Sequence, residues 1–174
     1  MDAIELLVDA FGRVADTVHA AVADLSEAEL AVRLDPEANS MAWLVWHLTR
    51  VQDDHVAGVA GTGQAYVDQG WAERFDLPFE PAGIGYGHSS SDVAAVHAPA
   101  DLLLGYHDAV HAQTVSYLRG GLSATDLDRV VDENWDPPVT LAVRLVSVVN
   151  DTMQHAGQAA FVRGIVERGR PSRM

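Results

Sequence analysis

The chain has 174 residues, with 25 acidic side chains against 11 basic ones, all of them arginine, eight histidines and no cysteine. This length is typical of one domain with a sizeable buried core. The lack of cysteine excludes disulfides, thiolate metal sites and cysteine nucleophiles, and the lack of lysine excludes Schiff-base chemistry and a P-loop. The formal charge of −14 argues against nucleic acid or an anionic membrane surface as a partner.

Targeting and membrane-spanning segments are not expected. The N-terminus begins with acidic rather than arginine-rich sequence, and the longest clean apolar run, Met41–Trp46, has six residues. A membrane helix needs roughly 20. With 48% hydrophobic residues and a mean hydropathy of +0.03, the composition predicts a soluble, cytoplasmic protein whose single domain spans residues 1–174.

Apolar residues recur every three or four positions in long segments, which predicts amphipathic helices. The expected long helices cover about 2–23, 39–61 (or 39–58), 101–120 and 140–168. Ser26 followed by Glu29 predicts a capping box on a short helical turn. Because strand-like alternation of useful length is not seen, we expect an all-α, four-helix bundle.

A long connection, residues 62–100, joins the second and third expected helices. Bundles normally use connections of roughly 2–8 residues, so a longer one is usually functional or a crossover. Five of the chain's 12 aromatic residues lie in it, which makes it too apolar for a disordered linker. They are Tyr66, Trp71, Phe75, Phe79 and Tyr86. Two interpretations stay open: a crossover packed across one end of the bundle, and a flap over a pocket.

Ionisable side chains fall on the inner faces of three expected helices. In the fourth, Asp151 and His155 are i and i+4 on an apolar face, so both can reach one ion. The second helix contributes His47, and the third contributes another i, i+4 pair, His107 and His111. Burying such groups without partners costs several kcal/mol. They therefore predict either a metal site in the bundle core or a buried hydrogen-bond network that fixes helix register.

Two sequence motifs stand out: Asn39–Leu48 (NSMAWLVWHL) and Asp151–Gln158 (DTMQHAGQ). They resemble the DinB-like superfamily, which includes the mycothiol-dependent maleylpyruvate isomerases and related thiol-dependent S-transferases. With Gly85–His88 and Trp135–Pro138, the resemblance covers nearly the whole chain. It implies a four-helix bundle that holds a metal ion, often zinc or nickel.

Carried over by position, the resemblance assigns the metal to His47, Asp151 and His155. Relatives commonly have His or Glu at the position of Asp151, whose shorter side chain is expected to bind more weakly or through water. The family pattern does not use the third helix, so His107 and His111 become core residues or neighbours of the ligands. Zn²⁺ is the metal expected first, and three protein ligands leave one position open on it. Two His with a carboxylate also suit Ni²⁺ or Fe²⁺.

The expected chemistry follows from an open metal position. A divalent metal binds a thiol as its thiolate, and a chain without cysteine must receive that thiol as a small co-substrate. The resemblance implies mycothiol or a similar thiol, used for S-transfer to, or isomerisation of, a small electrophilic or anionic substrate. Metal-assisted hydrolysis and a non-catalytic, stress-related bundle are the alternatives. Relatives that pair, together with the aromatic crossover, suggest a homodimer.

Four further residues are candidates around this centre. Arg144, three turns from His155 on nearly the same face, would pair with a carboxylate of the substrate or thiol, or with a structural acid. Asp54 would accept the second ring N–H of a metal-binding histidine, or be solvated. Tyr86 and His88 would line the cofactor pocket, unless their glycine-rich segment is only a turn.

Overall fold

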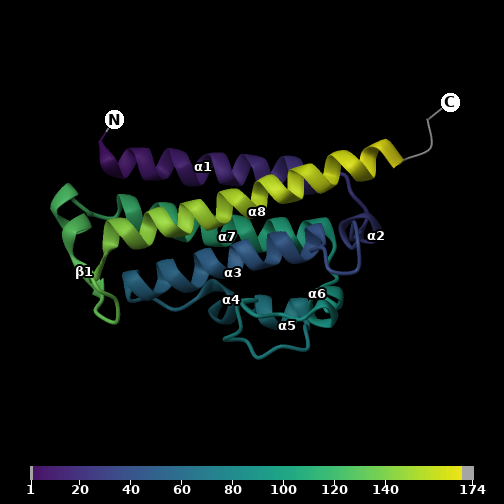
Figure 1. Ribbon diagram of the computed structural model, residues 1–174. Coiled ribbons are helices and arrows are strands. Elements are labelled where there is room, and N and C mark those ends of the chain that lie inside the picture. Colours follow the sequence, from purple (N-terminus) through teal and green to yellow (C-terminus); the bar gives the residue numbers. More distant parts are fainter. Residues whose placement is uncertain (1, 170–174) are drawn as a thin grey trace.

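The structure is a computed structural model that describes residues 2–169, so residues 1 and 170–174 of the expected domain lie outside the described part. Four long helices dominate it (Figure 1). They are α1 (Ala3–Val22), α3 (Met41–Ala60), α7 (Ala100–Arg119) and α8 (Leu141–Gly169). The predicted all-α bundle is therefore confirmed, and each long helix begins and ends within a few residues of its expected bounds.

The four helices form a bundle in which α1 and α3 occupy opposite corners, since each packs against both α7 and α8. Arg119 binds Glu5 and His19 binds Asp108, so α7 runs antiparallel to α1. Figure 1 shows α8 running in the same direction as α1, and α3 in the direction of α7. A connection between the parallel helices α3 and α7 must return along a helix about 30 Å long, which explains its length.

This crossover contains three short helices and lies along the α3–α7 side of the bundle (Figure 1). They are α4 (Ala65–Asp68), α5 (Trp71–Phe75) and α6 (Ser90–Ala95). Tyr66 and Phe75 are buried against Tyr106 of α7, with ring centroids 5.2 and 5.7 Å from it. The interpretation of a crossover packed across one end of the bundle is therefore wrong, because its aromatic residues face the side of α7.

The remaining elements sit at the ends of the bundle. The short helix α2 (Glu27–Leu30) has the predicted capping box between Ser26 and Glu29. The 3-10 helix η1 (Ala124–Asp128) precedes strands β1 (Val130–Asp132) and β2 (Val139–Thr140), which pair antiparallel. The expectation of no strand is thus corrected: segments of three and two residues are too short to produce a visible alternation.

Helix α3 is the most enclosed element, because α7, α8 and the crossover all pack against it. Every residue from Met41 to Asp53 is buried. Ser40 caps the helix by accepting a hydrogen bond from the Trp43 amide at 3.1 Å, and Gly61 ends it in the left-handed conformation, with φ at 68°. Within residues 2–169, none of the helices has the length and hydropathy that a membrane span requires.

His107 lies in the interior of the bundle, where neither ring nitrogen has a hydrogen-bond partner in the described chain. It therefore does not belong to a buried hydrogen-bond network of the kind the sequence allows. Burial, with a smaller repulsion from His111, lowers its pKa from 6.5 to about 4. Between these two values the unfolded chain takes up a proton that the folded chain does not, so stability falls as the pH falls through this window.

Replacing His107 by leucine is expected to weaken this pH dependence. Between pH 7 and 5 the free energy of unfolding of the wild type should fall by on the order of 2 kcal/mol more than that of the variant. The reason is that His107 takes up a proton in the unfolded state but not in the folded state. Chemical denaturation at several pH values measures the difference. The exposed His97, replaced by leucine, serves as the control and should keep the wild-type pH dependence. Equal slopes in wild type and His107→Leu would contradict the prediction.

Candidate metal centre

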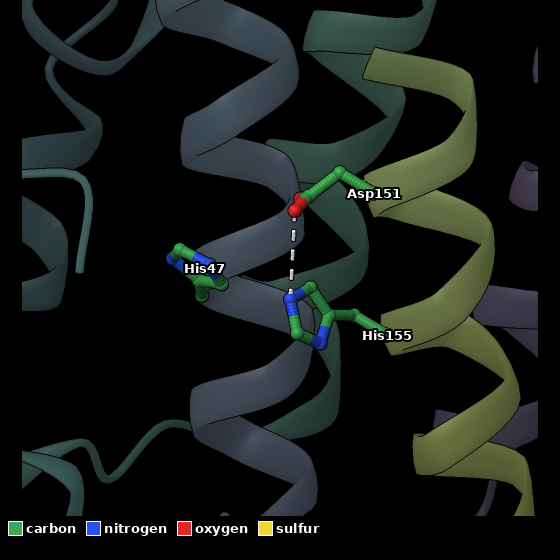
Figure 2. A group of neighbouring side chains, drawn as sticks. All are labelled: His47, Asp151 and His155. Carbon is green, nitrogen blue, oxygen red and sulfur yellow. Dashed lines mark ion pairs between the residues drawn. The ribbon is translucent and has the colours of Figure 1, made fainter. Parts of the chain in front are cut away.

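Three side chains from two helices meet between α3 and α8 (Figure 2). His47 comes from α3, and Asp151 and His155 come from successive turns of α8. One ligand atom from each lies within 4.8 Å of the other two. Nε2 of His155 is 3.8 Å from Oδ1 of Asp151, and the His47 and His155 ring centroids are 5.0 Å apart. Among residues 2–169 this is the one such group of three or more candidate ligands.

The centre is closed on one side and open on the other. His47 is buried within the enclosed helix α3, whereas the side chains of Asp151 and His155 are 25% and 19% exposed. The i, i+4 spacing keeps the α8 pair on one face of that helix. A small molecule can therefore approach the group from the α8 side without any movement of the core.

Both histidine rings are held by hydrogen bonds at Nδ1. His47 contacts the carbonyl oxygen of Ile84 at 2.5 Å, and His155 contacts Oε1 of Gln158 at 2.8 Å. Each acceptor fixes a proton on Nδ1 and leaves the Nε2 lone pair for an ion. The two rings are thus oriented as metal-binding histidines usually are.

The residues present fit a divalent metal. Oδ2 of Asp151 is buried and has no hydrogen-bond partner in the described chain, which is costly for a carboxylate oxygen. Desolvation lowers the pKa of His47, against the effect of the Ile84 carbonyl, and so favours the neutral ring that a metal requires. Two imidazole nitrogens and one carboxylate suit Zn²⁺, Ni²⁺ or Fe²⁺.

Aromatic residues surround His47. Trp43 stacks on its ring at 4.5 Å, and Tyr86 meets it edge-on at 5.4 Å while remaining largely exposed. His88 accepts a hydrogen bond from Nε1 of Trp43 at 3.1 Å and stacks on Trp46. The glycine-rich segment thus reaches the centre: Tyr86 lies at its rim, whereas His88 supports the tryptophans behind it.

Asp54 does not accept a hydrogen bond from either histidine of the centre. It lies two helical turns beyond His47, about 10 Å along the axis. It contacts Nδ1 of His55 at 3.0 Å and accepts a hydrogen bond from Gln64 at 2.8 Å. The expected hydrogen bond from a metal-binding histidine to Asp54 is therefore absent. The backbone oxygen of Ile84 and the amide oxygen of Gln158 already hold the rings of His47 and His155.

Arg144 forms an ion pair with Asp132 of β1 at 2.9 Å, which is the structural pairing that the sequence left open. It also lines a polar cavity of about 480 Å³, together with Asp54, His55 and Arg129. This cavity lies along the α3–α8 groove, toward the beginning of α8. Two of the predicted auxiliary residues are therefore brought together, but two turns away from the three candidate ligands.

Arg50 is a buried residue that sequence reasoning missed. Its guanidinium donates to the carbonyl oxygens of Pro81 at 2.9 Å and Gly83 at 3.2 Å, and to Gln64. These bonds fix the crossover immediately before Ile84, the residue whose carbonyl holds His47. The available signal was an arginine that follows the apolar run Met41–Trp46 in the same expected helix, three residues before an aspartate.

Replacing Gly85 by alanine is expected to weaken metal binding about 10- to 100-fold, the usual effect of disturbing a partner of a metal ligand. A Cβ at Gly85 would lie 2.6 Å from Nδ1 of His47, so the ring would have to move. Metal titration measures the affinity. Gly87→Ala is a matched control: Gly87 also has a positive φ, but nothing lies within 4 Å of its added Cβ. Equal losses in both variants would attribute the effect to backbone strain instead.

The fold and the centre together define a helical-bundle protein with a His/Asp/His group between its second and fourth long helices. The mycothiol-S-transferase family model matches residues 6–168, so the chain belongs to this DinB-like family. The chain is also similar to a conserved protein from Enterococcus faecalis whose crystal structure is known. That likeness has 31% sequence identity and a TM-score of 0.89, over 97% of this chain and 99% of the other. None of the curated proteins matches the chain.

Proposed function

We propose that this protein transfers mycothiol, or a similar small thiol, to a small electrophile at a metal held by His47, Asp151 and His155. Membership of the mycothiol-S-transferase family supports the reaction class. The observation that carries the metal is the unpartnered, buried Asp151 oxygen beside two histidines whose Nδ1 atoms are already engaged. Zinc is the first metal to test, because three protein ligands leave it one open position.

A metal at this position would supply a Lewis acid that favours the thiolate form of an incoming thiol. The residues of the chain provide the rest. Ile84 and Gln158 orient the two rings, so that little reorganisation is needed when the thiol binds. Trp43 and Tyr86 cover His47 and exclude water from its side of the centre.

The polar cavity beside Arg144 is suited to the polar part of the thiol. Arg129 and Arg144 bring positive charge and hydrogen-bond donors to it. Tyr86 contacts His47 edge-on at 5.4 Å, and its hydroxyl is near enough to Asp151 and Arg144 for their charges to act on its pKa. Desolvation raises the pKa of Tyr86, so its hydroxyl stays protonated and can donate to the thiol. Tyr86 and Arg144 are therefore proposed to orient the thiol.

A conjugation assay tests the proposal. The zinc-loaded protein is mixed with mycothiol and an electrophile, and product is followed by mass spectrometry with and without a chelator. We expect conjugation well above the uncatalysed rate, lost on chelation and restored by metal. Consumption of the electrophile without thiol would support hydrolysis instead. Conjugation that is unchanged by complete metal removal would contradict the proposed role of the centre.

A further inference from the structure

A second cavity, of about 570 Å³, opens on the other side of the metal centre. It lies between the segment that precedes α3 and the second half of α8, and most of its lining is apolar. Its lining includes Leu34, Leu44, Gln154, Gln158, Phe161 and Val162. Cavities of this size and character commonly bind small molecules. None of the three candidate metal ligands lines it.

One end of the cavity lies next to the candidate metal ligands. Gln158 lines it and also accepts the hydrogen bond from Nδ1 of His155 at 2.8 Å. Leu44, one turn before His47 on α3, closes its floor. From His155 to Val162 the cavity follows α8 for about 10 Å, at 1.5 Å per residue. A molecule lying in it would therefore have one end beside the centre.

Large apolar side chains stand at its mouth. Leu34 is 42% exposed and Phe161 is 64% exposed, and they approach the cavity from two separate parts of the chain. Single exposed apolar residues are ordinary, but a pair that flanks an apolar cavity indicates a binding surface. Covering both would add to the area that a ligand removes from water.

The end of the cavity beside the metal centre also offers hydrogen-bond donors, from the exposed side chain of Gln158. Because Oε1 of Gln158 accepts from His155, its amide nitrogen is left with two N–H groups that have no partner in the described chain. These donors lie beside the candidate ligands and suit a carbonyl oxygen. The remainder of the cavity, toward Phe161 and Val162, suits a hydrocarbon body.

We infer that this cavity is the acceptor site of the transferase, and that it takes an electrophile with an apolar body and a conjugated carbonyl group. The inference rests on the proposed function. In the reaction the thiolate sulfur bonds to the β-carbon of the activated C=C bond, and the π electron pair moves toward the carbonyl. The α-carbon then takes a proton from water. No group leaves, and no external oxidant or reductant is needed.

Binding of unreactive analogues tests the site without any turnover. N-methylsuccinimide and N-octylsuccinimide are titrated into the metal-loaded protein by calorimetry. Burying one CH₂ group completely contributes about 0.8 kcal/mol, which corresponds to about fourfold tighter binding, and burying it by half gives about twofold. We expect the octyl compound to bind at least tenfold more tightly, and Phe161→Asp and Leu34→Asp to remove most of that gain. Equal binding of the two analogues would overturn the inference.

The control for these substitutions is Val146→Asp. Val146 is also an exposed apolar residue of α8, but it does not line this cavity. The expected result is an unchanged preference for the octyl analogue. If Val146→Asp reduced the preference as much as Phe161→Asp, the effect would reflect general surface hydrophobicity, and the assigned site would be wrong.

Kinetics with N-alkylmaleimides separates the two proposals. The chain has no cysteine or lysine, so these acceptors meet no side-chain thiol or lysine amine on the protein. The kcat/KM for mycothiol conjugation should rise with alkyl length in the wild type and in Val146→Asp, and stay nearly flat in Phe161→Asp. Conjugation without any length dependence would overturn only the acceptor site. Selective binding of the octylsuccinimide without conjugation would overturn only the thiol-transfer function.

Discussion

Replacing His155 by alanine is expected to strip the metal from the protein and leave the fold intact. His155 lies on the open side of the centre, so its removal exposes the site to water instead of creating a closed cavity. Losing one of three ligands should weaken binding by more than the 10- to 100-fold typical of an outer partner. Metal content is measured by mass spectrometry after gel filtration, and the fold by circular dichroism and thermal unfolding.

Two further variants test whether the effect is specific. His111→Ala removes a member of the other i, i+4 histidine pair, whose residues lie outside the three-ligand group, and should keep the metal. His47→Gln replaces the buried ligand by a neutral side chain of similar size and should lose the metal as His155→Ala does. Full metal content in His155→Ala, or metal loss in His111→Ala, would show that the ion binds elsewhere.

Replacing Arg50 by methionine is expected to lower the free energy of unfolding by about 3–5 kcal/mol, the usual effect of breaking a buried ion pair. Arg50 and Asp53 have almost no exposed surface, so the variant leaves a carboxylate buried without its cation. Two backbone amides and the Tyr106 hydroxyl still donate to Asp53. Burial nevertheless raises the pKa of Asp53, which shows that desolvation outweighs these contacts. Urea denaturation at neutral pH measures the loss.

A second substitution identifies the cause. Adding Asp53→Asn to Arg50→Met removes the buried charge while keeping the volume, so the double variant should be less destabilised than the sum of the single changes. Arg119→Ala, which breaks an exposed ion pair with Glu5, should leave the denaturation midpoint nearly unchanged. Additive losses in the double variant would indicate that packing, not the uncompensated charge, makes Arg50 important.

Arg50→Met should also weaken metal binding. The guanidinium holds the carbonyl oxygens of Pro81 and Gly83, and the next residue supplies the carbonyl that orients His47. The affinity is measured by metal titration under conditions where the variant is fully folded. An unchanged affinity would show that Ile84 is held in place without Arg50.

The helices and the α8 ligand pair were predictable because they depend on spacing within one segment. A period of 3.6 residues places apolar positions on one stripe, and the same period puts Asp151 and His155 on one face. Ser40, Gly61 and the Ser26 capping box mark helix ends through hydrogen bonds only a few residues long. His47 was assigned by resemblance to a family; the structure places it beside the α8 pair, and its role as a metal ligand stays a prediction.

Contacts between distant segments were not predictable in this way. The Ile84 partner of His47 and the Asp132 partner of Arg144 depend on how the crossover and β1 pack against the bundle. The predicted contact between Asp54 and a metal-binding histidine was wrong for the same reason. Spacing along a helix shows on which side of the helix a residue lies, but not which side chain it meets there. Gln158, which holds His155 from three residues further along α8, is by contrast a local contact.

The eight histidines and the absence of cysteine limit the metal ligands that this chain can offer to imidazole and oxygen groups, because side-chain chemistry is a property of the residues themselves. They also mean that the thiol proposed here would have to come from outside the chain. The tertiary structure alone decided which histidines meet: His47 joins the α8 pair, whereas His107 is buried away from them with no hydrogen-bond partner in the described chain. That choice depends on the register between helices, which side-chain packing sets over the whole bundle.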